Sequence, residues 1–273
     1  MKYAILKYLA LFCAVLLLSP AAMTLIFISA TYLFAKRYRH EPTRKSAYFR
    51  GIFWSLVWLY ANLAYRLFGR QEPIPVQKQE TAIYLLPGFL DTPYAFWRLR
   101  RHLAKEGIKA YPIAYRRSFS SIREIAKDVC KMILLGNPQK IKLVGYSMGG
   151  IVAAYVNEYL LESKKAEQVV IVASPLQGTV LANIAFGMNA KEMRPQNDHL
   201  LLKELREKIE QNHNTKYNIL LSKNDNIILP WYRAKLKEDE SQHTHQVVED
   251  FDHASMILSK ENIELISQYL KAK

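Results

Sequence analysis

The stretch "LVGYSMGGIVAAYV", residues 143–156, places Ser147 between Gly145 and Gly149, where a short apolar run gives way to a run rich in alanine and valine. These flanks predict a buried strand before the serine and a helix after it. The turn between them needs small residues, because strand and helix pass close together there. The stretch therefore predicts a nucleophilic serine on a tight strand-to-helix turn, with the helix N-terminus stabilising negative charge beside it. The alternative is a glycine-rich turn with an incidental serine.

From Thr81 onward, short apolar segments alternate with longer amphipathic ones. This alternation is typical of right-handed crossovers in a mainly parallel sheet that is covered on both faces. The predicted strands are 82–86, 110–115, 141–145, 169–173 and 217–221. The predicted helices are 93–106, 122–135, 148–162, 200–212 and 261–272. We therefore expect an α/β fold with a mainly parallel, doubly wound sheet.

A serine alone is a poor nucleophile, so a base and an acid that orients the base must accompany it. Asp225 stands in "KNDNIILP", directly after a predicted strand, and His253 stands in "EDFDHASMI", before the last predicted helix. We expect His253 to take the proton from Ser147 and Asp225 to orient His253. The alternative for Asp225 is a plain turn residue beside Asn224 and Asn226.

Other residues compete for the roles of acid and base. Asp250 and Asp252 are close to His253 in sequence, too close to come from a separate strand end. The other histidines stand in basic, charged or polar surroundings, and they are His40, His102, His199, His213, His243 and His245. Asp225 and His253 therefore remain the expected pair.

The region from about Thr81 to Lys273 resembles the α/β-hydrolase superfamily, especially its small lipases and esterases. The chain order serine, aspartate, histidine is the order of that superfamily. Besides "GYSMGG", the sequence contains "LLPGFLDTP" at 85–93, similar to the family's oxyanion-hole loop, and "ASPLQGT" at 173–179, similar to a segment common in lipases. The last segment has an alternative interpretation as a strand-end turn.

The resemblance implies that the backbone N–H groups of Phe89 and Met148 form the oxyanion hole. It also implies two-step acyl transfer through an acyl-enzyme on Ser147, which requires neither a metal ion nor an organic cofactor. The chain departs from many lipases at Pro87 and Tyr146, where those enzymes have histidine. Both departures affect the expected substrate preference more than the chemistry.

The net charge of +14 is concentrated near the N-terminus. Residues 1–79 hold 11 Lys and Arg against two Glu, whereas residues 80–273 hold 27 basic against 22 acidic residues. Basic charge beside apolar sequence favours anionic lipid over nucleic acid, and no nucleic-acid-binding motif is present in the sequence. Cys13 and Cys130 lie in unrelated apolar settings and predict neither a disulfide framework nor a metal site.

Residues 9–35 form an uncharged stretch of 27 residues, preceded by Lys2 and Lys7 and followed by basic residues. A bilayer core requires about 20 apolar residues, so we expect residues 1–35 to be a transmembrane anchor. A cleavable signal peptide is the alternative, but cleavage after Ala21 would leave a dozen apolar residues at the new N-terminus.

Residues 51–69 are rich in aromatic side chains, and Ser55, Asn62 and Arg66 share one helical stripe. This segment lies in the membrane interface, completes a transmembrane hairpin, or packs on the catalytic domain, and we favour the first. A single span leaves the catalytic domain on the cytoplasmic side, whereas a hairpin places it on the other side.

We assign 36–79 as a basic stretch, aromatic helix and proline-containing linker, and 80–273 as a catalytic domain that suffices for chemistry.

These features predict a membrane-anchored serine hydrolase that cleaves carboxylic esters. A catalytic domain anchored beside aromatic and basic residues is placed to meet acyl lipids, which makes a lipase, esterase or phospholipase-like activity the first hypothesis. The expected partners are the lipid bilayer and an ester or acyl-lipid substrate, with no nucleic acid. A lipid acyltransferase that uses the same serine, and a catalytically silent membrane adaptor with the same fold, are the alternatives.

Overall fold

The structure is a computed structural model that describes residues 22, 25–38, 45–69, 80–115, 119–162, 165–195, 200–236 and 243–272. Most of the predicted anchor, including Cys13, lies outside these residues, as do His40, His199 and the proline-containing linker. The anchor assignment therefore stays a prediction.

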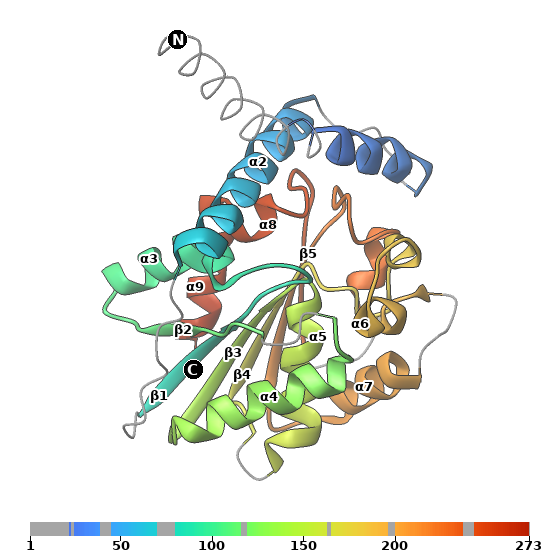
Figure 1. Cartoon of the computed structure of the whole chain (residues 1–273). Helices are drawn as coiled ribbons and strands as arrows, with labels where there is room; N and C mark the ends of the chain where they lie inside the picture. The colour runs from blue at the N-terminus through green and yellow to red at the C-terminus, as the bar shows by residue number, and fades with distance from the viewer. Residues whose placement is uncertain are drawn as a thin grey trace, which may run out of the picture.

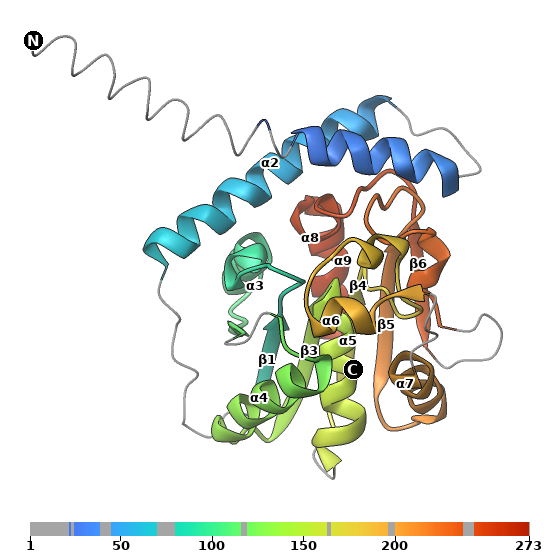
Figure 2. The same ribbon diagram turned by 45° about the vertical axis from the view of Figure 1, so that its right-hand side comes forward.

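Within the described residues, six parallel strands form one sheet in the order β2-β1-β3-β4-β5-β6 (Figures 1 and 2). The strands are β1 Thr81–Leu86, β2 Ala110–Pro112, β3 Lys140–Tyr146, β4 Gln168–Val172, β5 Lys216–Ser222 and β6 Thr244–Val248. The strand order reverses beside β1, because β2 lies on one side of it and β3 on the other. In open α/β sheets, ligands bind at the carboxyl ends of the strands at such a reversal.

Helices cover both faces of the sheet, as expected for parallel strands, and each face carries its own hydrophobic core. On one face lie α4 Ile122–Leu135, α5 Met148–Tyr155 and α7 Leu200–Gln211, and on the other lie α3 Trp97–Lys105, α8 Ser255–Leu258 and α9 Lys260–Lys271 (Figure 1). The expected parallel α/β sheet with two covered faces is confirmed.

Local sequence accounts for the bounds of several elements. The run "QVVIV" of β4 is buried at every position, as in strands covered on both faces. Helix α4 has the predicted bounds, because Ser121 and Glu124 form a capping box at its start. The predicted helix 148–162 is interrupted, since α5 is followed by a π turn, η3 Val156–Leu160. Strand β6 was missed by the sequence analysis.

Short elements complete the described chain. They are η1 Lys36–Tyr38, η2 Pro93–Phe96, η5 Val180–Asn183, α6 Met188–Glu192 and η7 Trp231–Ala234.

Residues 25–35 are helical, and α2 Lys45–Phe68 follows; both helices lie across the carboxyl ends of the strands (Figures 1 and 2). Every member of the predicted polar stripe of α2 is hydrogen-bonded to a loop of the domain: Ser55 to Asp252, Asn62 to Thr92, and Arg66 to Leu90. Packing on the catalytic domain, the third of the three interpretations, therefore describes the position of α2.

No helix among the described residues combines the length and apolar character needed to cross a bilayer.

Candidate active site

Ser147 occupies the turn between β3 and α5, as the sequence predicts. Its backbone has φ of 54° and ψ of −128°, an uncommon conformation for a residue with a side chain. A Cβ atom added to Gly145 would lie 2.3 Å from the carbonyl oxygen of Gly149, and one added to Gly149 would lie 2.0 Å from that of Leu86. Positions 145 and 149 must therefore be glycine. The close approach of strand and helix at these glycines holds Ser147 in its strained turn.

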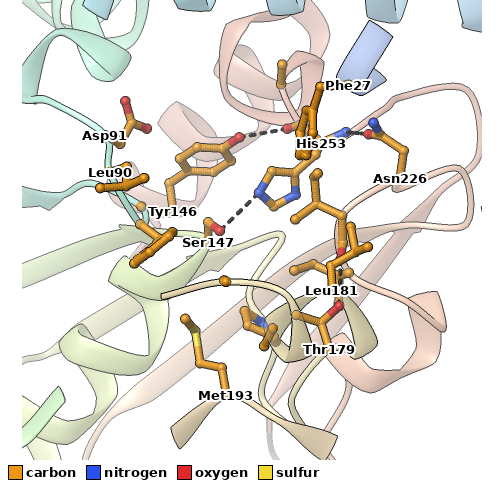
Figure 3. Close-up of a pocket in the computed structure, with 18 of the residues that line it drawn as sticks. Phe27, Leu90, Asp91, Tyr146, Ser147, Thr179, Leu181, Met193, Asn226 and His253 are labelled. Carbon is orange, nitrogen blue, oxygen red and sulfur yellow. Dashed lines mark hydrogen bonds between the residues drawn. The ribbon is translucent and has the colours of Figure 1, made fainter. Parts of the chain in front are cut away.

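A chain of hydrogen bonds connects Ser147, His253 and Asp225. The Nε2 atom of His253 lies 3.0 Å from Ser147 Oγ (Figure 3), and its Nδ1 atom lies 2.9 Å from Asp225 Oδ2. A carboxylate can only accept hydrogen bonds, so Nδ1 carries the proton toward Asp225 and Nε2 presents its lone pair to the serine hydroxyl. This is the geometry of a general base beside a nucleophile.

Asp225 is held in place by the backbone that follows β5. Its Oδ1 atom accepts hydrogen bonds from the N–H groups of Ile227 and Ile228, both at 2.8 Å. The carboxyl group is buried, with 2% of the side chain exposed, and the two N–H donors compensate its negative charge. Its other oxygen therefore points to His253 in a fixed direction.

Two residues that sequence reasoning did not assign to the site hold the backbone of His253. Its N–H donates to Oδ1 of Asn226 at 3.1 Å, and its carbonyl oxygen accepts from the hydroxyl of Tyr146 at 3.0 Å (Figure 3). Burial raises the pKa of Tyr146 well above its ordinary value, so the hydroxyl stays protonated and can donate. Both residues adjoin a predicted site residue in sequence, but no pattern reveals their contact with His253.

Three of the competing acids and bases make contacts with other groups. Asp252 accepts from the N–H of Ser255 at 2.9 Å, His102 pairs with Glu106 on α3, and Nε2 of His243 lies 2.7 Å from the carbonyl oxygen of Ile209. Across the described residues, no three His, Cys, Asp or Glu side chains are grouped so that they could bind a metal ion.

The residues predicted for the oxyanion hole flank Ser147 on two sides. Met148 is the first residue of α5, and Phe89 lies on the loop after β1. Gly88 brings this loop against the serine, because a Cβ atom added to Gly88 would lie 3.0 Å from Ser147 Cβ. The loop and the start of α5 therefore meet beside the Ser147 side chain.

A cavity of about 820 Å³ opens above Ser147 and His253, which both line it (Figure 3). Its wall is mainly apolar, with contributions from Phe27, Phe89, Leu181 and Met193. Much of the wall comes from the segment 179–193. Thr179 fixes this segment to the loop after Asp225, because its Oγ1 donates to the carbonyl oxygen of Ile227 at 2.6 Å.

Two buried carboxyl groups lie where α2 meets the site. Asp91, on the loop after Phe89, accepts from Trp58 Nε1 at 3.1 Å, and Asp252 precedes His253. Burial raises the pKa of Asp91 to about 6, and burial also raises the pKa of Asp252. Folding therefore disfavours the charged form of both groups.

Replacing Asp91 with asparagine is expected to change how stability depends on pH. The folded-state pKa is raised, so the stability that Asp91 contributes is present below pH about 4 and is lost as pH rises through about 6. An asparagine side chain cannot ionise, so the free energy of unfolding of Asp91→Asn should rise relative to the wild type by about 2 kcal/mol between pH 4 and pH 8. Urea unfolding at both pH values measures this, and a difference that stays constant with pH would contradict it.

Solved structures with this topology define the class of the fold. The chain matches the mature lipase BlEst2 from Bacillus licheniformis with a TM-score of 0.58 at 15% identity, over 74% of this chain and 95% of that one. It matches the esterase EaEST from Exiguobacterium antarcticum with a TM-score of 0.55 at 14% identity, over 71% and 93% of the two chains. The type II thioesterase BorB from the borrelidin biosynthetic cluster matches with a TM-score of 0.53 at 16% identity, over 74% and 96%. The chain therefore has the α/β-hydrolase fold.

Within this fold class, the chain belongs to the uncharacterised protein family UPF0227, whose family model matches residues 101–270. No curated protein sequence matches the chain.

Proposed function

We propose that the protein is a serine hydrolase that cleaves carboxylic esters of long acyl chains. The observation that carries this proposal is the hydrogen-bonded chain from Ser147 Oγ through His253 to Asp225, located at an apolar cavity of about 820 Å³. Cavities of this size accommodate large organic ligands, and a mainly apolar wall selects apolar ones.

The first half of the reaction forms an acyl-enzyme. Ser147 Oγ attacks the ester carbonyl carbon while Nε2 of His253 takes the hydroxyl proton, and Asp225 stabilises the resulting imidazolium. The N–H groups of Phe89 and Met148 stabilise the tetrahedral oxyanion. The carbon–oxygen bond to the alcohol then breaks, and His253 gives its proton to the departing oxygen.

The second half releases the acid. His253 takes a proton from a water molecule, whose oxygen attacks the acyl carbon, and the bond to Ser147 Oγ breaks as His253 returns the proton to the serine. The products are one alcohol and one carboxylic acid for each ester and water consumed.

Acyl chain length tests this assignment. The full chain in detergent should hydrolyse p-nitrophenyl acetate, butyrate and octanoate with kcat/KM rising with chain length, by at most about fourfold for each buried methylene. A free carboxylic acid should be the product detected by mass spectrometry. A constant or falling series would contradict the acyl-binding role of the cavity, and the absence of any turnover would contradict an ester hydrolase.

A matched pair of variants locates the acyl chain in the cavity. Leu181→Trp reduces the space inside the cavity wall and should lower the rate for octanoate far more than for acetate. Leu135→Trp makes the same change at an exposed position on α4 and should leave the series unchanged. Equal effects of the two variants would remove the support for this site of acyl binding.

We further propose that the enzyme acts at a membrane. The uncharged stretch 9–35 and the basic residues after it support this proposal, as do large exposed apolar side chains on the two N-terminal helices, among them Ile26, Leu33 and Phe49. The full chain should stay in the membrane fraction after alkaline carbonate extraction. Release by carbonate would contradict an integral anchor.

A further inference from the structure

The two N-terminal helices contact the catalytic loops through specific polar side chains. Each contacted residue adjoins a residue with a role in the proposed reaction: Asn226 follows Asp225, Asp252 precedes His253, and residues 90–92 follow Phe89. A helix that only covered apolar surface would not require this pattern of hydrogen bonds.

The contact with the histidine loop has a defined direction. The hydroxyl of Thr31 donates to the carbonyl oxygen of Ile28 at 2.8 Å, which leaves its oxygen to accept from Asn226 Nδ2 at 2.8 Å. The other end of the Asn226 amide, Oδ1, accepts from the N–H of His253 at 3.1 Å. Thr31 thus fixes the orientation of the amide that holds the backbone of His253. Thr31 and Asn226 are both 3% exposed, so water does not readily replace Thr31.

The contact with the loop after β1 engages three consecutive residues. Asn62 Oδ1 accepts from the N–H and the hydroxyl of Thr92, at 2.8 and 2.6 Å. The Trp58 indole donates to Asp91 at 3.1 Å, and Arg66 donates to the carbonyl oxygen of Leu90 at 2.8 Å. Asn62 is 5% exposed, so its loss would leave the Thr92 donors buried without this acceptor.

We propose that Thr31 and Asn62 are positioning residues of the active site, with Thr31 acting through Asn226 on His253 and Asn62 acting through Thr92 on the oxyanion loop. This inference rests on the proposed hydrolase function. It also implies that the catalytic unit begins before residue 80, so a chain that starts near Gln79 would lose much of its turnover rather than retain it.

Thr31→Val tests the histidine branch, because it removes the hydroxyl and keeps the shape of the side chain. A small displacement of a catalytic group lowers turnover strongly, so kcat for a short soluble ester should fall by about 10- to 100-fold while KM stays within about twofold. Thr31→Ser keeps the hydroxyl and should restore kcat.

Thr215→Val is the matched control. Thr215 is also buried, its hydroxyl also donates to a backbone carbonyl, that of Ala166 at 2.8 Å, and it lies at the amino end of β5, away from the site. This variant should unfold at a lower temperature without a change in kcat. Equal kcat in Thr31→Val and Thr215→Val would overturn the proposal for Thr31.

A second pair of variants tests whether Asn62 positions the oxyanion loop. This pair also tests the proposal if Thr31→Val does not fold. Asn62→Ala should lower kcat by about tenfold or more. Asn212→Ala is the matched control, because Asn212 Oδ1 also accepts two hydrogen bonds, from the N–H groups of Asn214 and Thr215. This variant should leave kcat unchanged. Equal kcat in these two variants would overturn the role of Asn62.

A readout that does not depend on turnover separates this inference from the proposed function. The proton between His253 Nδ1 and Asp225 should give a low-field proton NMR signal in the wild type, which Thr31→Val shifts or broadens and Thr215→Val does not. An unchanged signal in Thr31→Val would overturn the inference even if the wild type hydrolyses esters. If the wild type hydrolyses no ester while Thr31→Val alters the signal, the proposed function fails and the positioning contact stands.

Discussion

Ser147→Ala is expected to lower kcat for ester hydrolysis by at least about 10⁴-fold. In the proposed reaction the serine oxygen attacks the carbonyl carbon, and it lies 3.0 Å from the base, Nε2 of His253. Alanine also removes a hydroxyl without adding volume, so the turn between β3 and α5 should persist. Rates with p-nitrophenyl butyrate, together with thermal unfolding of both proteins, measure the effect.

Product binding provides the control for this variant. The proposed acyl-binding cavity is left in place by Ser147→Ala, so the affinity of the protein for butyrate or octanoate should change little. Turnover within about tenfold of the wild type would contradict the role of Ser147 as nucleophile.

Asp225→Asn is expected to lower kcat by about 10³- to 10⁴-fold with little change in KM. An asparagine amide that donates to His253 Nδ1 favours the tautomer with the proton on Nε2, and that tautomer cannot take the proton from Ser147. The N–H groups of Ile227 and Ile228 can still bind the amide oxygen, which keeps the loop folded. Steady-state kinetics at a saturating ester concentration measure the loss.

Asp250→Asn and Asp252→Asn are the comparison for Asp225→Asn, since both acids lie within three residues of His253 in sequence. Each should retain kcat within about tenfold, because the hydrogen bond to His253 Nδ1 comes from Asp225. If either variant lost more turnover than Asp225→Asn, the assignment of the acid would be wrong.

The sequence predicts Ser147, Asp225 and His253 as partners, and the structure joins them by hydrogen bonds. Gly145 and Gly149 are demanded by close contacts within the turn around the serine, and Asp225 directly follows a buried apolar run that predicts a strand. Chain order then connected the three. Their proximity in space is a consequence of parallel strands whose carboxyl ends meet at one edge.

Strand β6 was missed because its signal is weak. Its sequence "THQVV" is short, and all of its side chains are exposed or half-buried, as at a sheet edge that one neighbour pairs. Polar residues precede it, so neither a buried run nor a clear alternation marks the strand.

The position of α2 could not be predicted because its partners are distant in sequence. Its aromatic residues are typical of a membrane interface, and only the fold reveals that Ser55 meets Asp252, 197 residues away. The same holds for Thr31 and Asn226, which lie 195 residues apart. A polar stripe on an apolar helix indicates that the helix meets donors and acceptors, without identifying them.

The most direct test of the central claim is the site of covalent modification by a fluorophosphonate, located by mass spectrometry of the digested full chain. The reagent reacts with a serine that an adjacent base activates, so the account predicts one adduct, on the peptide that contains Ser147. An unmodified Ser147 in a protein that still hydrolyses esters would contradict it.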